Sequence, residues 1–319
     1  MPEAPLVSVI IPAFNAAGVI TQSLASVRDQ TFRDFEAIIV DDGSTDDTAA
    51  LARRFCAADP RFCVLQQAHT GIPVARNAAI ARARGAWIAF QDADDVWLPQ
   101  KLERQVELSR ADPRANLLFT NFYYWDGDRD LHANYLAGQP LPEGDAAREL
   151  VSACVYGNLT VMLRRETFRR VGGFDPAFEF AQDWDLWLRI ADQGLWARGT
   201  YESLARYRRW PGCQTNQKLA VAEWAVRVLE KNSRASQRPE LRPLYQRSLT
   251  ARRTRLEFVR ARSLIGCRPE AVPAAIWRAW RLNPRRLKWL MWTGLVAWPN
   301  LLGGRATAGI VHRKILRKW

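Results

Sequence analysis

Short apolar segments rich in β-branched residues alternate with amphipathic segments along the first 125 residues of the 319-residue chain. Residues 7–11 (VSVII) form one apolar segment, and residues 16–30 place Ile20, Leu24 and Val27 on one face of a helix. The alternation continues with apolar segments at 35–40, 63–65, 86–90 and 116–124 and helical segments at 44–55, 73–84 and 98–109. Strands and helices that alternate at this spacing favour βαβ units. The sequence therefore predicts an α/β, Rossmann-like fold with a mostly parallel sheet flanked by helices.

Residues between and after these segments suggest further boundaries. Ser44 or Thr45 is expected to cap the helix that runs to about Phe55. Residues 127–150 are richer in Gly, Pro and polar residues and are expected to form a loop, whereas residues 217–265 are helical in pattern and rich in Arg.

Charge is divided unevenly along the chain. The whole chain carries 46 Lys and Arg against 33 Asp and Glu, a net charge of +13. Residues 216–319 hold 23 basic and 5 acidic side chains, whereas residues 1–215 hold 23 basic and 28 acidic ones. The sequence therefore predicts a mildly acidic domain over 1–215 and a basic helical extension over 216–319. Such asymmetry points to an anionic partner for the extension, either a membrane or nucleic acid.

The sequence lacks the signatures of several classes of protein. The five cysteines are odd in number, widely spaced and without a CxxC pair, so neither a disulfide framework nor a zinc site is expected. The three histidines form no metal-ligand pair by spacing. The first residues lack a basic segment followed by an apolar one, so no signal peptide is expected and a reducing cytosol is the simplest compartment. GxSxG, P-loop and GxGxxG patterns are missing, which argues against hydrolase, ATPase and dinucleotide-binding functions.

Acidic side chains follow two of the predicted strands. DDGSTDDT occupies 41–48, and QDADD occupies 91–95. In parallel α/β sheets, ligands bind beyond the carboxyl ends of the strands. Carboxylates gathered there repel one another unless a cation or hydrogen-bond donors compensate, and a hard divalent cation that also holds a diphosphate is a natural compensation. The alternative is that Asp and Gly only mark the turns after strands.

Five segments occur in an order that resembles the family 2 glycosyltransferases, which have the GT-A fold. They are VSVIIPAFN (7–15), IIVDDGSTDDT (38–48), GIPVARNAAI (71–80), IAFQDADDVWLP (88–99) and VGGFDPAFEFAQDWDLWLRIA (171–191). The resemblance covers about residues 5–212. A single DxD is a weak signal, but five motifs in order are specific.

The resemblance implies which residues bind a nucleotide-sugar. The segment that lines the nucleotide base corresponds to Pro12, Ala13, Phe14 and Asn15. Asp42 matches the acid that accepts a hydrogen bond from the base, and Arg76 lies near the base and phosphates in such proteins. The DxD-type segment that contacts ribose and metal corresponds to Asp92, Asp94 and Asp95. Asp94 is expected to contact ribose or metal and Asp95 to bind Mn²⁺ or Mg²⁺, although the DADD spelling permits two registers. The metal would bridge the diphosphate and stabilise the leaving nucleotide.

The segment that begins at Gln182 resembles the family's EDxDLW-type motif. Inverting transfer needs one general base that faces the acceptor hydroxyl. Asp183 matches the position usually assigned as that base, and Asp185 is the second candidate. Gln182 stands where the family often has Glu, which removes one negative charge beside the base. The alternative is a helix start at which the dipole favours Asp. Trp184 and Trp187 are expected in the core, although Trp184 could also stack on a sugar.

Residues 207–212 (YRRWPG) resemble a YRxHxG segment in which a His can help to cover the diphosphate or metal. Trp210 stands in the place of that His, which puts the ligand role in doubt. Arg208 or Arg209 could still pair with phosphate, or both could be solvated surface arginines.

The last fifty residues combine tryptophans with basic residues. Residues 289–298 (WLMWTGLVAW) are the most apolar stretch, yet they are too short to cross a bilayer, which needs about 20 residues. Trp beside Arg and Lys suits the headgroup region of an anionic membrane. A helical cap packed on the catalytic domain is the alternative, and no recognisable nucleic-acid-binding fold accompanies the charge.

Together these features predict a metal-dependent, inverting glycosyltransferase that moves a sugar from a nucleoside-diphosphate sugar to a hydroxyl of a glycan or lipid-linked acceptor in cell-surface polysaccharide synthesis. It is expected in the cytoplasm, peripheral on the inner face of the cell membrane. Two alternatives remain: a metal-dependent nucleotidyltransferase, and a non-catalytic sugar-nucleotide or membrane-binding module.

Overall fold

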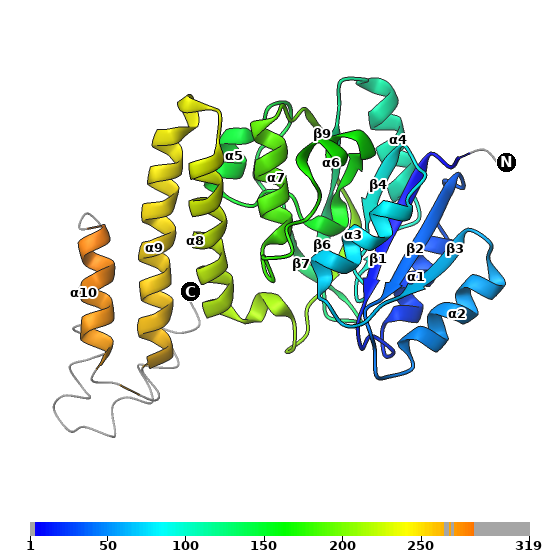
Figure 1. The fold of residues 1–319 in the computed structure, drawn as a ribbon, viewed down its shortest axis with the longest axis horizontal. Helices are drawn as coiled ribbons and strands as arrows, with labels where there is room; N and C mark the ends of the chain where they lie inside the picture. Colours follow the sequence, from blue (N-terminus) through cyan, green and yellow to red (C-terminus); the bar gives the residue numbers. More distant parts are fainter. Residues whose placement is uncertain (1–3, 265–267, 269–270, 284–319) are drawn as a thin grey trace. The chain divides into compact units, whose positions relative to one another are not determined.

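The computed structural model describes residues 4–264, 268 and 271–283. The chain divides into two compact units, one formed by Met1–Cys213 with Arg234–Leu241 and the other by Gln214–Ser233 with Arg242–Trp319. The larger unit contains the sheet, and the smaller one is helical where it is described (Figure 1). The short segment 234–241 thus returns to the sheet-containing unit after the first part of the helical one.

The sheet of the larger unit has nine strands in the order β3-β2-β1-β4-β8-β6-β9-β5, with β7 paired to β6. Their bounds are β1 Val7–Ala13, β2 Phe35–Asp41, β3 Phe62–Gln66, β4 Trp87–Phe90, β5 Val96–Trp97, β6 Leu117–Trp125, β7 Asp130–Asn134, β8 Met162–Arg164 and β9 Ala197–Arg208. Strands β3, β2, β1 and β4 are parallel neighbours, and Ala13 at the end of β1 pairs with Asp41 at the end of β2. The acidic segments that follow β2 and β4 therefore leave the sheet at the same edge.

The α/β fold is confirmed, and the sheet is mixed. The half built from β3, β2, β1 and β4 is parallel as predicted, whereas β8 joins β4 and β6 antiparallel, and β5 joins β9 antiparallel. Strands β6 and β9 are again parallel to each other. Hydrophobic periodicity predicts where a strand lies in the sequence but not whether it pairs parallel or antiparallel with its neighbour. The antiparallel pairs were therefore not predicted.

Helices of the larger unit flank this sheet in Figure 1. Their bounds are α1 Ile20–Arg28, α2 Thr48–Ala58, α3 Ile72–Arg82, α4 Lys101–Ala111, α5 Ala147–Ser152, α6 Arg165–Val171 and α7 Gln182–Asp192, with short 3₁₀ turns at Asn158–Thr160 and Pro239–Leu241. Helix α1 buries Ile20, Leu24 and Val27, the face that the sequence predicted. Burying each such side chain contributes about 1.5–3 kcal/mol. Every residue of β1 is buried, which fits its continuous apolar sequence.

Two predicted boundaries are wrong. Helix α2 begins at Thr48 after Asp47 rather than at Ser44 or Thr45. Ser44 does not cap this helix, because its hydroxyl accepts a hydrogen bond from the backbone N–H of Asn15 in the loop after β1. The segment 127–150, expected as a loop, contains β7 and the start of α5, since β6 supplies a pairing edge that the local composition does not reveal.

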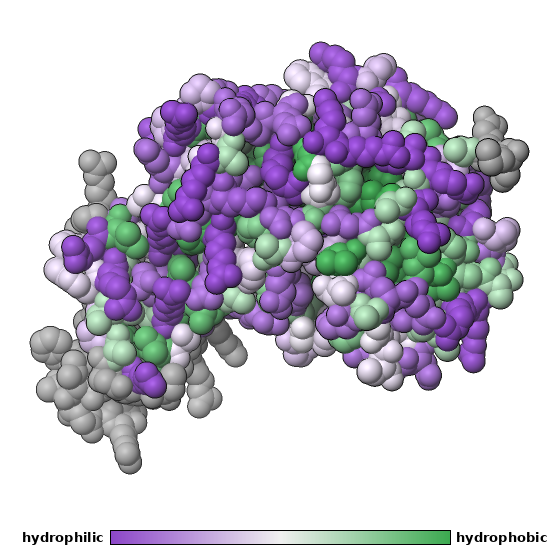
Figure 2. Space-filling model, in the orientation of Figure 1, coloured by the Kyte–Doolittle hydropathy of each residue, from purple (hydrophilic) through white to green (hydrophobic). Residues whose placement is uncertain are grey.

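The helical unit contains most of α8 (Lys218–Ala235), together with α9 (Arg242–Leu264) and α10 (Val272–Leu282), which lie side by side in Figure 1. Ala222 and Val226 of α8 pack with Leu256 of α9. Ala261 of α9 packs with Ile276 and its neighbours on α10. Figure 2 shows hydrophilic side chains over much of the face of α8 and α9 that is in view. None of the described helices combines the length and the apolar character that crossing a bilayer requires. The apolar stretch 289–298 lies outside the described residues.

Candidate active site

The loop after β1 exposes an aromatic ring at the carboxyl edge of the sheet. Pro12 and Ala13 are buried at the end of β1, and Phe14 follows them with 43% of its surface exposed. Asn15 adopts a left-handed backbone with φ of +47°, and its side-chain oxygen accepts a hydrogen bond from the backbone N–H of Thr45 at 2.8 Å. The Phe14 ring stacks on the imidazole of His69, with 4.0 Å between ring centroids. The two rings form a flat aromatic pair beside the start of the β2–α2 loop.

Asp42, directly after β2, organises the loop that carries His69. One carboxylate oxygen accepts hydrogen bonds from the side chain of Gln67 at 2.7 Å and the backbone N–H of Thr70 at 3.0 Å. The other accepts from the backbone N–H of Gly71 at 2.8 Å and lies 2.9 Å from His69 Nδ1. Burial opposes ionisation of this carboxyl, but the hydrogen bonds outweigh it and lower its pKa. Asp42 is therefore an ionised anchor for residues 67–71.

Arg76 on α3 connects the acidic segment after β4 with the start of α7. Its side chain is only 3% exposed and donates a hydrogen bond to Asp92 Oδ1. Its guanidinium lies over the ring of Phe174, 5.3 Å from the centroid. Burial raises the pKa of Asp183, the positive charge of Arg76 opposes that rise, and the negative charge of Asp92 adds to it. Asp92 and Asp183 are 91 positions apart in the sequence, yet both interact with the positive charge of Arg76.

Asp94 and Asp95 lie in the short segment between β4 and β5. Asp95 is 1% exposed, and its Oδ1 accepts a hydrogen bond from the backbone N–H of Arg208 at 2.9 Å. Its Oδ2 is buried and has no hydrogen-bond partner among the described residues. Asp94 Oδ2 accepts a hydrogen bond from Trp210 Nε1 at 3.2 Å. Burial, followed by the charges of neighbouring acids, raises the pKa of both carboxyls. The protein therefore compensates the repulsion between these acids only in part.

This donor set fits a hard divalent cation. An unpartnered buried carboxylate oxygen costs free energy that a cation would recover. Within the part of the chain that the structure describes, His, Cys, Asp and Glu side chains nowhere form a group of three or more arranged to hold a metal on their own. Mg²⁺ and similar ions are commonly held by one or two carboxylates together with substrate phosphates and water. Asp94 and Asp95 match that mode, in which a diphosphate completes the coordination.

Arg208, the last residue of β9, closes over the segment that holds these acids. Its Nε donates to the carbonyl oxygen of Asp94 at 2.8 Å, and its Nη2 donates to Gln22 on α1 at 2.7 Å. The guanidinium lies 4.2 Å from the ring centroid of Trp125. A positive charge is therefore fixed beside Asp94 and Asp95.

The turn before α7 is tied to α3. Gly172 and Gly173 have φ of +81° and +82°, a backbone conformation that favours glycine. Asn77 on α3 bonds both the N–H and the carbonyl of Phe174, at 3.0 and 2.8 Å. Ala181, also left-handed with φ of +55°, then precedes the first turn of α7. This arrangement holds Asp183 on the same side of the sheet edge as Arg76.

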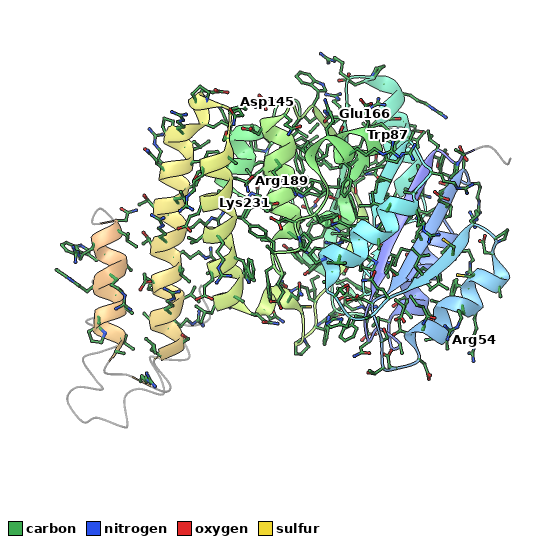
Figure 3. The ribbon with its side chains drawn as sticks, viewed as in Figure 1. Arg54, Trp87, Asp145, Glu166, Arg189 and Lys231 are labelled. Carbon is green, nitrogen blue, oxygen red and sulfur yellow. The ribbon has the colours of Figure 1, made fainter. Side chains whose placement is uncertain are left out.

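The remaining residues of the α7 motif have different surroundings. Asp185 is fully buried and accepts a hydrogen bond from Arg189 Nε at 2.8 Å; Arg189 is labelled on α7 in Figure 3. Trp184 is 3% exposed, and its indole N–H donates to the carbonyl of Leu150, so it packs in the core rather than stacking on a sugar. Trp187 is completely buried, as predicted.

Sequence reasoning missed two contributors to this site. It gave His69 no role, although the imidazole stacks on Phe14 and lies beside Asp42. It gave Trp210 no partner, although the indole reaches Asp94. The sequence did show Trp210 in place of a His, but the residue that the indole contacts, Asp94, lies 116 positions away, so the contact could not be predicted.

Comparisons with known proteins place these features in context. The family described as Glycosyl transferase family 2 matches residues 8–172. TuaG of Bacillus subtilis (strain 168), assigned by its name to teichuronic acid biosynthesis as a glycosyltransferase, is 37% identical over 210 residues, which cover 64% of this chain and 79% of TuaG. WfgD of Escherichia coli, named as a UDP-Glc:alpha-D-GlcNAc-diphosphoundecaprenol beta-1,3-glucosyltransferase, is 33% identical over 58% of this chain and 69% of its own length.

Two solved structures have a similar fold. TarS residues 1–349 from S. aureus, in complex with UDP-GlcNAc, aligns with a TM-score of 0.67 at 19% identity and covers 98% of this chain and 90% of its own. The mannosyltransferase PcManGT from Pyrobaculum calidifontis, in complex with GDP-Man and Mn²⁺, aligns with a TM-score of 0.63 at 21% identity over 98% of this chain and 86% of its own.

Proposed function

The chain belongs to glycosyl transferase family 2 and has the GT-A fold that its motifs predicted, and from this premise we propose that it transfers a sugar, with inversion, from a nucleoside-diphosphate sugar to an acceptor hydroxyl. The observation that carries the proposal is the convergence of Asp92, Asp94, Asp95 and Asp183 around Arg76 and Arg208 at one sheet edge. Donor complexes of TarS and PcManGT, and the names of TuaG and WfgD, support a nucleotide-sugar donor and a role in cell-surface polysaccharide synthesis.

The nucleotide end of the donor is assigned to the loop after β1. The exposed ring of Phe14, stacked on His69, presents an apolar surface on which a base would stack. Pro12, Ala13 and Asn15 shape this surface, and Asp42 holds the adjoining loop through its bonds to Thr70 and Gly71. The base site is therefore largely preorganised, which reduces the ordering that binding requires.

The reacting end of the donor is assigned to the acids after β4. Asp94 and Asp95 would hold a Mn²⁺ or Mg²⁺ ion, which supplies charge stabilisation to the leaving nucleoside diphosphate. Arg76 and Arg208 place fixed positive charges beside the same segment, where they would stabilise the diphosphate as its negative charge grows.

Asp183 is assigned as the general base. It takes the proton from the acceptor hydroxyl while that oxygen attacks the anomeric carbon from the face opposite the diphosphate. A raised pKa makes this carboxylate a stronger base than an exposed Asp, and the positive charge of Arg76 opposes that rise. Asp185, paired with Arg189 in the core, lacks access to an acceptor and is assigned to holding α7.

Product analysis tests the reaction. Incubation with a panel of nucleotide-sugars, Mn²⁺ and a lipid-linked or glycan acceptor should release nucleoside diphosphate and form a linkage of inverted anomeric configuration, as followed by NMR. Release of pyrophosphate would instead support a nucleotidyltransferase. Donor binding without turnover, unchanged by Asp95→Ala and Asp183→Asn, would support a non-catalytic module.

The basic extension is assigned to an anionic membrane on the cytoplasmic side. Helix α9 contains seven Arg and one Glu, and Arg247, Arg255 and Arg262 recur at helical spacing on one side of it. On α10, Trp277 is 53% exposed and stacks on Trp280, with ring centroids 4.7 Å apart. An exposed indole stacked on a half-buried one, beside Arg, suits the headgroup region of anionic lipid.

Sedimentation with vesicles tests the membrane assignment. Binding to phosphatidylglycerol vesicles should exceed binding to phosphatidylcholine vesicles and weaken with salt. Replacing Trp277 and Trp280 together by Ala should reduce it, whereas Tyr201→Ala, at an exposed aromatic residue of the larger unit, should not. Equal binding to both lipids, or none, contradicts the assignment.

A further inference from the structure

The indole of Trp210 approaches an acid that the proposed function assigns to the metal. Trp210 Nε1 lies 3.2 Å from Asp94 Oδ2, while 49% of the residue remains exposed. An indole N–H donates one hydrogen bond and has no lone pair to offer a metal, unlike an imidazole. The Trp in this position therefore acts on the carboxylate rather than on the cation.

The turn that carries Trp210 is closed by Cys213. The backbone N–H of Trp210 donates to Cys213 Sγ at 3.1 Å, and the thiol lies 3.4 Å from the carbonyl oxygen of Arg208. The backbone N–H of Cys213 also donates to the carbonyl of Trp210 at 3.1 Å. Cys213 is 5% exposed. These contacts fix the backbone from which the indole extends, so the position of the ring is built into the turn.

Gly212 leaves room for the indole in this position. A Cβ atom at Gly212 would lie 2.1 Å from Cζ3 and 2.5 Å from Cη2 of the Trp210 ring. Both distances are far below van der Waals contact, so any side chain at 212 would push the ring from its place. The ring thus depends on a glycine two residues later for its approach to Asp94.

We propose that Trp210 is a positioning residue for the divalent cation: its N–H holds Asp94 Oδ2 so that the remaining lone pairs of the carboxylate face the cation, which is then held by oxygen atoms alone. This inference rests on the proposed function, because it assumes that Asp94 ligates the metal. Outer partners that orient a ligating carboxylate commonly change metal affinity by 10- to 100-fold. An all-oxygen ligand set also suits Mg²⁺ and Mn²⁺ over softer metals.

The test measures the affinity for Mn²⁺, both alone and with UDP or GDP at a fixed concentration, from the EPR signal of the free ion, in the full-length chain. Trp210→Phe keeps an aromatic ring and removes the N–H, so the dissociation constant should rise about 10-fold or more. Gly212→Ala, which displaces the ring but leaves the Trp in place, should have a similar effect. Trp196→Phe, which removes an indole N–H that donates to a different carboxylate, Asp112 Oδ2, at 3.0 Å, is the matched control and should bind Mn²⁺ as the unaltered protein does.

Rescue separates positioning from a merely structural role. Trp210→His can direct a ring N–H at Asp94, and it should restore Mn²⁺ affinity at least to that of the unaltered protein. It should also raise affinity for Ni²⁺ relative to Mg²⁺, because imidazole is a ligand that Ni²⁺ favours. Thermal unfolding of each variant shows whether it is folded, and Trp210→Phe remains decisive if Gly212→Ala fails to fold.

The outcomes distinguish this inference from the proposed function. If the unaltered protein and Asp95→Ala bind Mn²⁺ equally or not at all, the metal assignment fails, and the inference fails with it. If Asp95→Ala loses Mn²⁺ while Trp210→Phe binds as tightly as the unaltered protein, or more tightly, only the role of Trp210 is overturned.

Discussion

Asp183 and Asp185 stand two residues apart on α7, and replacing each by Asn should give opposite results. Asp183→Asn removes the proposed base, and general-base catalysis typically contributes about 10²- to 10⁴-fold, so kcat should fall within that range. Its stability at neutral pH should be unchanged or higher. Burial raises the pKa of Asp183 above its unfolded value, so the ionised form is disfavoured in the folded protein, and a neutral amide removes that penalty.

Asp185→Asn should instead destabilise the fold. Asp185 is fully buried and bonded to Arg189, whose other donors hold the carbonyls of Val171 and Gly173. Removing one partner of a buried ion pair costs about 3–5 kcal/mol. We expect about 3 kcal/mol, since the replacement amide still accepts a hydrogen bond. For a unit of this size, that corresponds to a fall in Tm of roughly 6–12 °C. The folded fraction should keep most of its kcat.

Two measurements decide the comparison. Thermal unfolding gives the change in Tm, and initial rates at saturating donor, corrected for the folded fraction, give kcat. If Asp185→Asn abolishes turnover with Tm unchanged, while Asp183→Asn keeps its activity, the base has been assigned to the wrong carboxylate. If both variants lose activity and stability together, the two side chains act as one structural unit and the separation of roles is refuted.

Three further predictions concern neighbouring parts of the site. Arg76→Met removes the cation that lowers the pKa of Asp183, so the acid limb of kcat/KM against pH, which falls as the base is protonated, should begin at higher pH; an unmoved limb would contradict the pairing. Phe14→Ala removes the stacking ring and should weaken binding of nucleoside diphosphate by about 1–3 kcal/mol in calorimetry, and unchanged affinity would place the base elsewhere. Gly173→Ala combines a positive φ with a Cβ that would lie 2.9 Å from a side-chain oxygen of α3, whereas Gly172 has a similar φ and open space around it. In chemical denaturation, Gly173→Ala should therefore lower the free energy of unfolding more than Gly172→Ala does. Equal losses would show that only φ matters.

The parallel half of the fold could be predicted from the sequence because its signals are local. The β-branched residues of 7–11 and 35–40 marked β1 and β2, and Ile20, Leu24 and Val27 marked the buried face of α1. Parallel strands carry their carboxyl ends to one edge, so the acids that follow β2 and β4 could be placed there from topology alone.

The rest of the site could not be predicted because it depends on contacts between distant segments. Asp95 meets the backbone of Arg208 across 113 positions, and Ser44 bonds the loop after β1 rather than its own helix. Neither contact has a periodic signature. Motif resemblance supplied Asp183, but nothing in the sequence distinguished its surroundings from those of Asp185, since the pairing of Asp185 with Arg189 is an ordinary helical spacing that many exposed pairs share.

The acids at the sheet edge differ in how the protein treats their charge. Asp42 receives donors from Gln67, Thr70 and Gly71, and its pKa falls despite burial. Asp95 is buried and Asp94 and Asp183 are half-buried, and their pKa values rise because their few hydrogen-bond donors do not outweigh the effect of burial. A fold selected only for stability gains nothing from such acids, because replacing them by neutral residues would relieve the repulsion. Carboxylates whose charge the protein compensates only in part are expected at a functional site, where a ligand that binds and dissociates neutralises that charge. In this chain the division matches the proposed roles: hydrogen bonds from the protein stabilise the charge of Asp42, beside the proposed base site, whereas the charges of Asp94, Asp95 and Asp183 are available to the proposed cation, diphosphate and proton.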